Sequence, residues 1–102
     1  MVAKRALIMH PSDNVATAVE EIQPGDEVAI PTTTAAIRLR ATEAIPFGFK
    51  VALQDLRPGE IIRKYGETIG KASVPIGKGA LVHIHNLEGT RARGDLEGRG
   101  ER

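Results

Sequence analysis

The chain has 102 residues, of which 41% are hydrophobic, so it has room for one small domain with a limited core. Its formal net charge is +1 with the two signs interspersed, and 3% of its residues are aromatic, which argues against a nucleic-acid-binding surface. The absence of cysteine excludes disulfides, thiolate metal sites and cysteine nucleophiles. No stretch has transmembrane length and the first apolar run is too short for a signal peptide, so we expect a soluble cytoplasmic protein without a membrane partner.

The chain begins with a short apolar run that leads into a polar turn. Residues 6–9 are apolar and predict a strand. Residues 10–14 predict a turn, in which Pro11 keeps His10 out of the helical region. Residues 15–19 carry aliphatic side chains over a stretch too brief to distinguish one short helix from a strand.

A turn with a glycine three positions after an aliphatic residue occurs three times, at residues 22–25, 56–59 and 76–79. In the first two copies a proline precedes the glycine and pre-sets one backbone dihedral, while the glycine accepts a positive φ. Each copy leads into an aliphatic stretch that predicts a new strand. The irregular spacing of the copies argues against a solenoid, so we interpret them as repeated corners of one small all-β domain.

The remaining segments complete a mainly β prediction. Residues 36–41 alternate as a strand does, and residues 49–53 and 62–65 predict two further strands. Residues 66–72 contain two glycines close together and predict a loop with a bulge. Short strands separated by turn glycines favour a compact barrel or clip-like β fold with one or two short helices.

We predict two parts in the chain, a β domain over residues 1–87 and a polar tail over residues 88–102. The tail contains Leu96 as its single sizeable aliphatic residue, so it cannot bury a core. The modest core and the aliphatic residues on short strands favour self-association into a dimer or trimer.

Two of the three histidines fall in the last predicted strand, residues 81–86. In a strand, Val82 and Ile84 would face one side while His83 and His85 face the other. Two imidazoles at this spacing can approach one divalent metal ion. His10, in its turn, could converge on them, with Asp13 as a further ligand; the simpler alternative is that all three histidines are solvated surface residues.

Lys50 lies among apolar neighbours and could anchor a substrate carboxylate. An equally simple interpretation is an edge-strand lysine that prevents edge-to-edge pairing. The sequence contains no phosphate-binding loop and no nucleophile elbow.

Four stretches, taken in order, resemble the SAF domain of the altronate/galactarate dehydratase family: residues 10–16, 47–53, 64–70 and 82–87. The similarity runs from about Leu7 to Leu96. The resemblance implies a β-clip fold, and the short chain is similar to the form in which this domain is a separate small subunit.

The resemblance implies a β-elimination from a hydroxy acid, with a sugar acid or related hydroxy acid as substrate. Such chemistry uses a base beside the carboxylate, a cation that stabilises the enediolate and an acid for the leaving hydroxyl. The family implies a divalent metal, with iron(II) as the first choice and manganese or magnesium as alternatives. This metal would be shared with a large catalytic subunit, and we expect the chain to be inactive without that subunit. The implied roles are catalytic for His10 and His85, metal-binding for His83 and His85, and substrate-binding for Asp13, Asn14, Lys50 and Asn86.

Several alternatives stay open. The leaving group could be sulfite, as in the small subunit of sulfolactate sulfo-lyase. The chain could instead be a non-catalytic SAF module that binds sugars or proteins, or a stand-alone metal-binding protein. One departure from the family pattern is Phe49, where we expect histidine in many relatives, so no catalytic role is assigned to position 49. The arginines of the tail, Arg91 and Arg93, could order against carboxylates of a partner.

Overall fold

The computed structural model describes residues 3–89, which form nine short strands. The predicted mainly β fold is confirmed. The strands are β1 Lys4–Leu7, β2 Val15–Ala18, β3 Glu27–Pro31, β4 Ala36–Arg40, β5 Lys50–Ala52, β6 Ile61–Lys64, β7 Glu67–Ala72, β8 Leu81–Val82 and β9 Leu87–Glu88.

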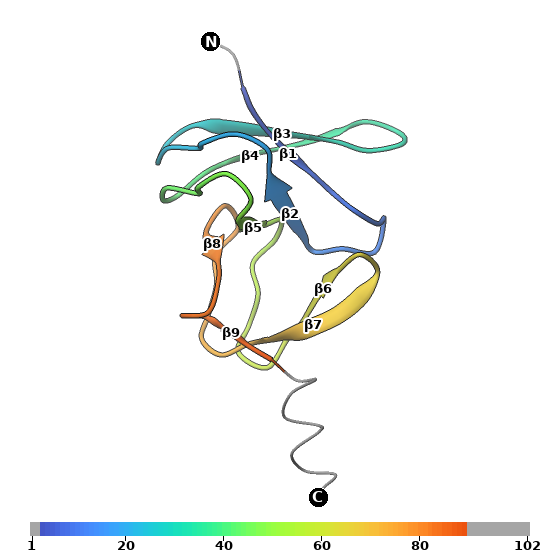
Figure 1. Cartoon of the computed structure of the whole chain (residues 1–102), viewed down its shortest axis with the longest axis vertical. Helices are drawn as coiled ribbons and strands as arrows, with labels where there is room; N and C mark the ends of the chain where they lie inside the picture. The colour runs from blue at the N-terminus through green and yellow to red at the C-terminus, as the bar shows by residue number, and fades with distance from the viewer. Residues whose placement is uncertain (1–2, 90–102) are drawn as a thin grey trace, which may run out of the picture.

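The strands form two sheets, which lie above one another in Figure 1. The larger sheet has the order β4-β3-β1-β2-β5-β8, and the smaller one has the order β6-β7-β9. All pairings are antiparallel except that of β1 with β3, which is parallel. The pairing of β2 with β5, which is distant in the sequence, places residues 15–18 beside residues 50–52.

Two hydrophobic cores fill the domain, and β2 and β5 separate them. Ala16 and Val51 point into the upper core, while Val15 and Ala52 point into the lower one. This division follows from the alternation of side chains along a strand. The largest fully buried side chains are Ile22, Ile30, Ile45, Ile62, Val15, Val28, Val51 and Val82.

The repeated turn occurs four times rather than three, because residues 45–48 form a copy that sequence reasoning missed. The glycine of each copy has a φ between +87° and +90°. The N–H of each turn glycine donates to the carbonyl of a buried alanine. Each of these alanines lies four residues before the aliphatic residue that begins another of the four turns. The four glycine–alanine pairs are Gly25 with Ala41, Gly48 with Ala18, Gly59 with Ala72, and Gly79 with Ala52.

The copies associate in two pairs, one in each core. Isolated bridges join Ile22 to Ile45 in the upper core and Leu56 to Ile76 in the lower core. The pairing explains why the copies recur without a regular period: each pair closes one core, and the spacing between copies depends on the hairpins inserted between them. The aliphatic residue of each turn thus forms part of a core, while the turn itself stays at the surface.

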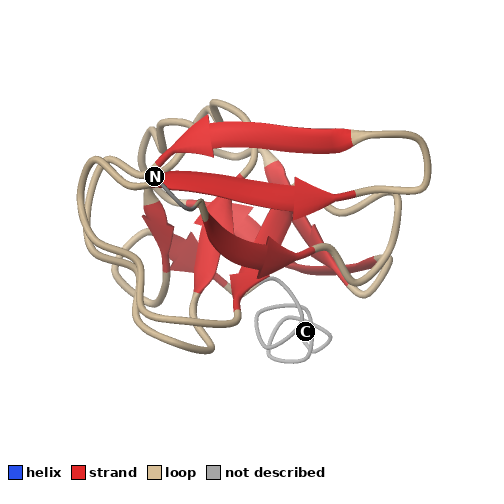
Figure 2. Ribbon diagram, turned by 90° about the horizontal axis from the view of Figure 1, so that it is seen from above, coloured by secondary structure: helices blue, strands red, loops and turns tan. Residues whose placement is uncertain are grey.

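Two expectations about local structure were wrong. The expected short helices do not occur within residues 3–89 (Figure 2), and residues 15–18, for which a helix and a strand were both open, are a strand. Residues 67–72, predicted as a loop, form β7, which is paired on both sides by β6 and β9. The bulge predicted in this stretch is confirmed, because Ile62 pairs with Gly70 and Arg63 with Thr68, which leaves Ile69 as the extra residue of β7. No helix in the described part of the chain is long and apolar enough to cross a membrane.

The predicted boundary at residue 87 falls within β9, because Glu88 still pairs with Lys71. From residue 90 onward, the predicted tail lies outside the described residues.

Candidate functional site

His10 stands in the turn between β1 and β2 and is exposed. Its Nδ1 atom accepts the backbone N–H of Ser12 at 3.1 Å and lies 2.9 Å from the Ser12 hydroxyl oxygen. The backbone N–H can only donate, whereas the hydroxyl can also accept. Ser12 therefore offers Nδ1 a partner whether or not this nitrogen carries a proton, and the Nε2 atom stays available to exchange a proton with a ligand.

The side chain of Asp13 connects this turn to the end of the β6–β7 hairpin. Its two carboxylate oxygens accept the backbone N–H groups of Tyr65 at 3.0 Å and Gly66 at 2.8 Å. Asp13 is 7% exposed, so these bonds are shielded from water. They close the hairpin turn in which Tyr65 has a φ of 59° and Gly66 a φ of 75°. These values are typical of a two-residue hairpin turn with both central residues left-handed.

The hairpin end packs directly against the imidazole of His10. A Cβ atom at Gly66 would lie 2.9 Å from the Cγ and Cδ2 atoms of the His10 ring. Glycine is therefore required twice at this position, for its positive φ and for the close approach of the ring. His10 is held between Ser12 on one side and Gly66 on the other.

Asn14 makes a second connection to the same hairpin. Its Nδ2 donates to the carbonyl of Ile61 at 2.9 Å, and its Oδ1 accepts the N–H of Arg63 at 2.9 Å. These bonds span the register shift in β6. Asp13 and Asn14, for which we predicted substrate contacts, thus use their polar atoms to attach β6 and β7 to the His10 turn, and their role toward a substrate stays a prediction.

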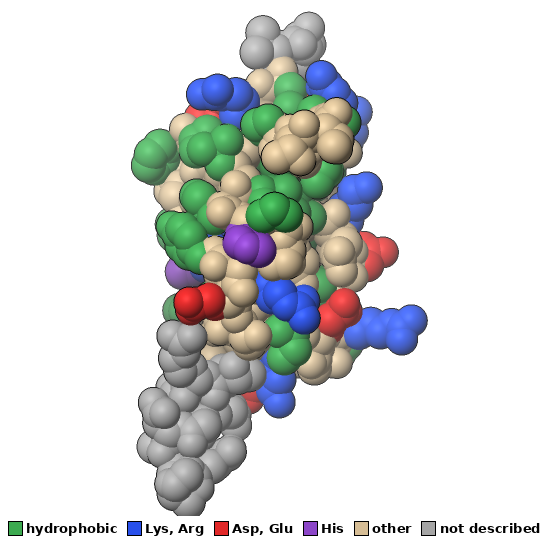
Figure 3. Space-filling view, turned by 90° about the vertical axis from the view of Figure 1, so that its right-hand side faces the viewer, with side chains coloured by type: hydrophobic (Ala, Val, Ile, Leu, Met, Phe, Trp, Pro, Cys, Tyr) green, Lys and Arg blue, Asp and Glu red, His purple; other side chains and the backbone are tan. Residues whose placement is uncertain are grey.

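Two hollows flank the His10 turn. One, of about 330 Å³, lies between this turn and the β3–β4 connection, with Ile8, Met9 and Ile37 as apolar lining and His10 at its edge. Figure 3 shows apolar side chains gathered around a histidine on this face of the molecule. The second hollow, of about 460 Å³, is polar and is lined by Asn14, Gln54, Glu60 and Arg63 among others. The turn is therefore accessible from both sides.

The other two histidines lie in a turn and do not share the face of a strand. The strand β8 ends at Val82, and Asn86 closes the following turn: its Oδ1 accepts the N–H of His83 at 2.9 Å and its Nδ2 donates to the carbonyl of Leu81 at 2.8 Å. Ile84, which we expected to be buried, is 81% exposed. The predicted strand-like alternation of residues 82–85 was wrong. The buried amide of Asn86 bonds the His83 N–H and the Leu81 carbonyl, which in a continuous strand would bond a neighbouring strand.

The turn orients its two histidines differently. The ring of His83 lies 4.6 Å from the ring of Phe49 between centroids, with a tilt of 50°. His85 is exposed. The contact also assigns a packing function to Phe49, the position at which we expected histidine from the resemblance.

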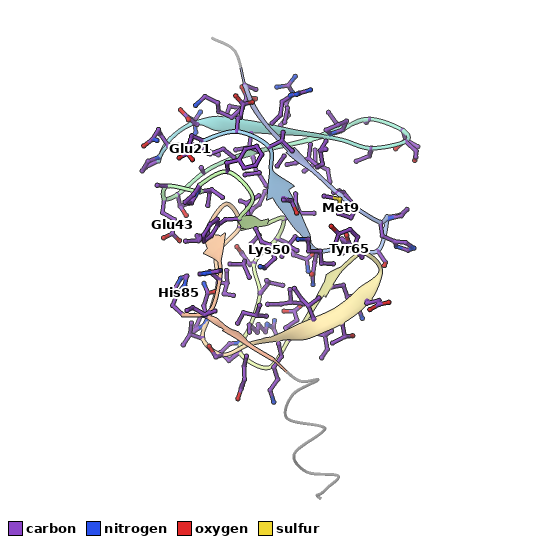
Figure 4. All side chains as sticks on the ribbon, in the orientation of Figure 1. Met9, Glu21, Glu43, Lys50, Tyr65 and His85 are labelled. Atoms are coloured by element: carbon purple, nitrogen blue, oxygen red, sulfur yellow. The ribbon has the colours of Figure 1, made fainter. Side chains whose placement is uncertain are left out.

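The histidines do not converge on one point. In Figure 4, His85 lies on the opposite side of the molecule from Met9 and Tyr65, and His10 packs beside Tyr65 against Gly66. Within residues 3–89, no group of three or more histidine, aspartate or glutamate side chains could hold a metal ion. The donor groups of residues 3–89 therefore do not fit a divalent metal unaided.

Lys50 lies on β5, which has β2 on one side and β8 on the other. The edge-strand interpretation is therefore wrong. Lys50 pairs with Thr17 and with Val82, and it is half-buried. Burial, with a smaller contribution from the nearby charge of Lys64, holds the pKa of Lys50 below its usual range. Figure 4 places Lys50 centrally, between His85 and Tyr65.

Sequence reasoning overlooked Thr17, Lys64 and Tyr65. Tyr65 could have been identified, because a tyrosine directly before glycine at the end of a predicted strand occupies a position where asparagine or glycine is usual. Its side chain is 62% exposed, and the Lys64 ammonium lies 5.2 Å from its ring centroid. Nothing in the sequence indicated that Thr17 would lie beside Lys50, because that contact depends on the pairing of β2 with β5.

Fold and site together define a small β domain that presents polar turns at its surface and lacks an enclosed active site within the described residues. Residues 4–90 match the family model of the altronate/galactarate dehydratase SAF domain. The chain belongs to this family.

Individual relatives agree with this assignment. Altronate dehydratase of Escherichia coli (strain K12) is 37% identical over 78 residues, which are 76% of this chain and 15% of that protein. Altronate dehydratase of Bacillus subtilis (strain 168) is 34% identical over 85 residues, 83% of this chain and 16% of that protein. The alpha subunit of (2R)-sulfolactate sulfo-lyase from Paracoccus pantotrophus is 44% identical over 54 residues, 53% of this chain and 81% of that subunit.

The chain thus spans about a sixth of the altronate dehydratases and most of the Paracoccus subunit. The relatives are lyases, and the subunit name of the last one implies an enzyme assembled from more than one chain.

Proposed function

We propose that this chain is the small SAF subunit of a hydroxy-acid lyase of the altronate dehydratase type, which eliminates water β to a carboxylate together with a separate large subunit. The observation that carries the proposal is His10, an exposed imidazole held by Ser12 and Gly66 at the edge of a hollow, in a chain of the SAF family. One oriented proton-transfer group without an enclosed site is what half of a shared active site would contain.

In this proposal His10 transfers a proton through Nε2. Elimination requires removal of the proton next to the carboxylate and protonation of the leaving hydroxyl. When Nδ1 is protonated it can donate to the Ser12 hydroxyl, and when it is not it accepts the Ser12 N–H. A base at Nε2 carries its other proton on Nδ1 both before and after the transfer, so the Ser12 hydroxyl is the partner that supports this tautomer and the imidazolium formed from it.

The proposed divalent metal, iron(II) first and manganese or magnesium as alternatives, would supply the positive charge that stabilises the enediolate. The described residues contain no three-ligand cluster, so the large subunit would have to provide most of the ligands, with His83 or His85 completing the set. Buried in its turn, Asn86 would then position these histidines rather than contact the substrate. The cytoplasmic location and self-association remain part of this proposal.

The test is a pull-down from native cytoplasm with the full chain as bait, followed by an elimination assay on the recovered complex with iron(II) and sugar acids. We expect a large partner to be recovered and the complex, but not the chain alone, to dehydrate a sugar acid. His10→Gln should lower turnover about 100-fold or more, as expected for loss of a proton-transfer group. Lys78→Gln is the matched control, because the Lys78 side chain is exposed and the hydrogen bond to Asp55 comes from its backbone N–H. Turnover by the chain alone would refute the proposal.

Sulfite elimination is the second candidate, because the chain covers 81% of the Paracoccus sulfo-lyase subunit at 44% identity. The same recovered complex, supplied with sulfolactate, distinguishes the two. Sulfite release without dehydration would favour this candidate. Capture of a sugar acid or a protein without any elimination would instead support a non-catalytic SAF module.

A further inference from the structure

One face of the larger sheet carries a row of side chains in which a lysine lies beside a hydroxyl group. Leu7 pairs with Thr17, Thr17 with Lys50, and Lys50 with Val82, so all four side chains are on the same face. Val82 belongs to the lower core, whereas Leu7 is 38% exposed. The row therefore passes from the core to the surface, with Thr17 and Lys50 at the transition.

Thr17 and Lys50 form a close cross-strand pair. The N–H of Ala18 donates to Phe49 and the N–H of Leu53 donates to Asn14, and hydrogen-bonded pairs alternate along an antiparallel ladder. Thr17 and Lys50 are therefore a non-hydrogen-bonded pair, the kind in which side chains approach most closely.

The polar groups of this pair are unsatisfied within the described residues. The Thr17 hydroxyl is buried and has no hydrogen-bond partner. Lys50 forms neither an ion pair nor a hydrogen bond with residues 3–89, and the charged neighbour that acts on it is another cation, Lys64. A buried hydroxyl without a partner and a half-buried ammonium without an anion each cost stability.

A single group would satisfy both side chains. A carboxylate has two acceptor oxygens, and the ammonium group and the hydroxyl can both donate to them. We propose that Lys50 and Thr17 form a binding site for a carboxylate.

This inference extends the proposed function, since a hydroxy-acid substrate carries such a group. Two sources share the chemistry, a small hydroxy acid and an aspartate or glutamate of the large subunit. The small hydroxy acid is tested first, by NMR titration of the full chain with sodium gluconate at constant ionic strength. Sorbitol, which has the same hydroxyl groups and no charge, is the control ligand.

We expect gluconate, and not sorbitol, to shift the Thr17 and Lys50 side-chain signals and to raise the pKa of Lys50. Lys50→Met should weaken gluconate binding about tenfold or more, because a charge-assisted hydrogen bond is lost. Lys78→Met, at a lysine whose side chain is exposed and whose hydrogen bond to Asp55 comes from the backbone N–H, should leave binding within twofold. Lys50→Arg preserves the charge and shows whether the loss follows from charge rather than from packing.

If gluconate causes no shift, the affinity of each variant for the large subunit is measured next. This affinity shows whether the carboxylate comes from an aspartate or glutamate of the large subunit. A tenfold loss with Lys50→Met and none with Lys78→Met assigns the carboxylate to the partner. If neither gluconate nor the partner responds to Lys50→Met, the carboxylate site is refuted. Gluconate binding at Lys50, together with a recovered complex that shows no elimination activity, would keep this site and refute the proposed function, so the two failures are distinguishable.

Discussion

The two histidine-bearing turns are held in different ways. The His10 turn is attached to the β6–β7 hairpin by Asp13 and Asn14, through bonds between residues 47 to 53 positions apart. The turn of His83 and His85 is closed by Asn86, through bonds to residues three and five positions away. The His10 turn is therefore fixed by tertiary contacts, whereas the turn of His83 and His85 is closed by local hydrogen bonds and leaves its tip exposed.

The difference indicates separate functions for the two turns. The proton transfer proposed for His10 would benefit from a fixed orientation, which long-range bonds and the contact with Gly66 give to this side chain. A tip with exposed Ile84 and His85 suits contact with a partner, since such a tip can adapt when the partner binds. Four substitutions would break or sharpen this comparison.

The largest effect is expected for Asp13→Ala. The substitution leaves the N–H groups of Tyr65 and Gly66 without their acceptors in a partly buried location, and each lost bond to a charged group costs up to about 3 kcal/mol. We expect the free energy of unfolding to fall by about 3 kcal/mol, measured by urea denaturation. Asp13→Asn, which keeps one acceptor oxygen, should recover part of it. A loss below 1 kcal/mol would contradict the long-range attachment.

Gly66→Ala should have the next largest effect. The new Cβ would meet the His10 ring at 2.9 Å and would impose a φ of 75° on alanine, at about 1–2 kcal/mol. We expect altered NMR signals of the His10 ring and a decrease of about 1–2 kcal/mol in the free energy of unfolding. Gly77→Ala is the matched control, because its φ is not positive and nothing lies within 4 Å of its Cβ. Unchanged His10 signals in Gly66→Ala would contradict the contact.

Asn86→Ala should cost about 1–2 kcal/mol, because one buried amide contributes two hydrogen bonds. The structural change should stay local. We expect the signals of His83 and His85 to shift in an NMR spectrum and those of His10 to stay unchanged. A shift at His10 would show that the two turns are coupled and would remove the distinction drawn above.

The smallest effect concerns the pH dependence of stability through Lys50. Burial and the neighbouring Lys64 lower its pKa in the folded state, so on raising the pH the folded chain releases this proton before the unfolded chain does. The unfolded state then binds more protons, and the free energy of unfolding rises with pH between the lowered pKa and about 10.5. Lys50→Met should abolish this alkaline rise, measured by urea denaturation across that range; Lys78→Met should keep it.

Local sequence patterns predicted the turns better than they predicted what surrounds them. Three of the four glycine turns were recognisable, because an aliphatic residue and a glycine at fixed spacing impose the same backbone in every context. The fourth, at residues 45–48, escaped notice because a proline directly after Ile45 and two phenylalanines conceal the pattern. The predicted loop at residues 66–72 is a strand because pairing with β6 and β9 outweighs the low strand propensity of Gly70.

The site shows the same limit. The residue types of the candidate site were identified, since histidine, lysine and carboxylates are the groups that can move protons and bind carboxylates. Their neighbours were not: the sequence contains no sign that Asp13 holds Tyr65 and Gly66, or that Thr17 lies beside Lys50. Such contacts join segments 33 or more residues apart, and local periodicity carries no information about which distant segment a strand will pair with.

The sequence by itself therefore determined the mainly β class, most of the glycine turns and the family, because each depends on residue type and short spacing. The tertiary structure alone decided that β2 and β5 lie together and that His10 packs against Gly66. It also decided that the histidines point to opposite sides of the domain. The physical reason is that two cores must each be closed by a pair of turns, and the pairing that buries their aliphatic residues also decides which polar groups meet at the surface.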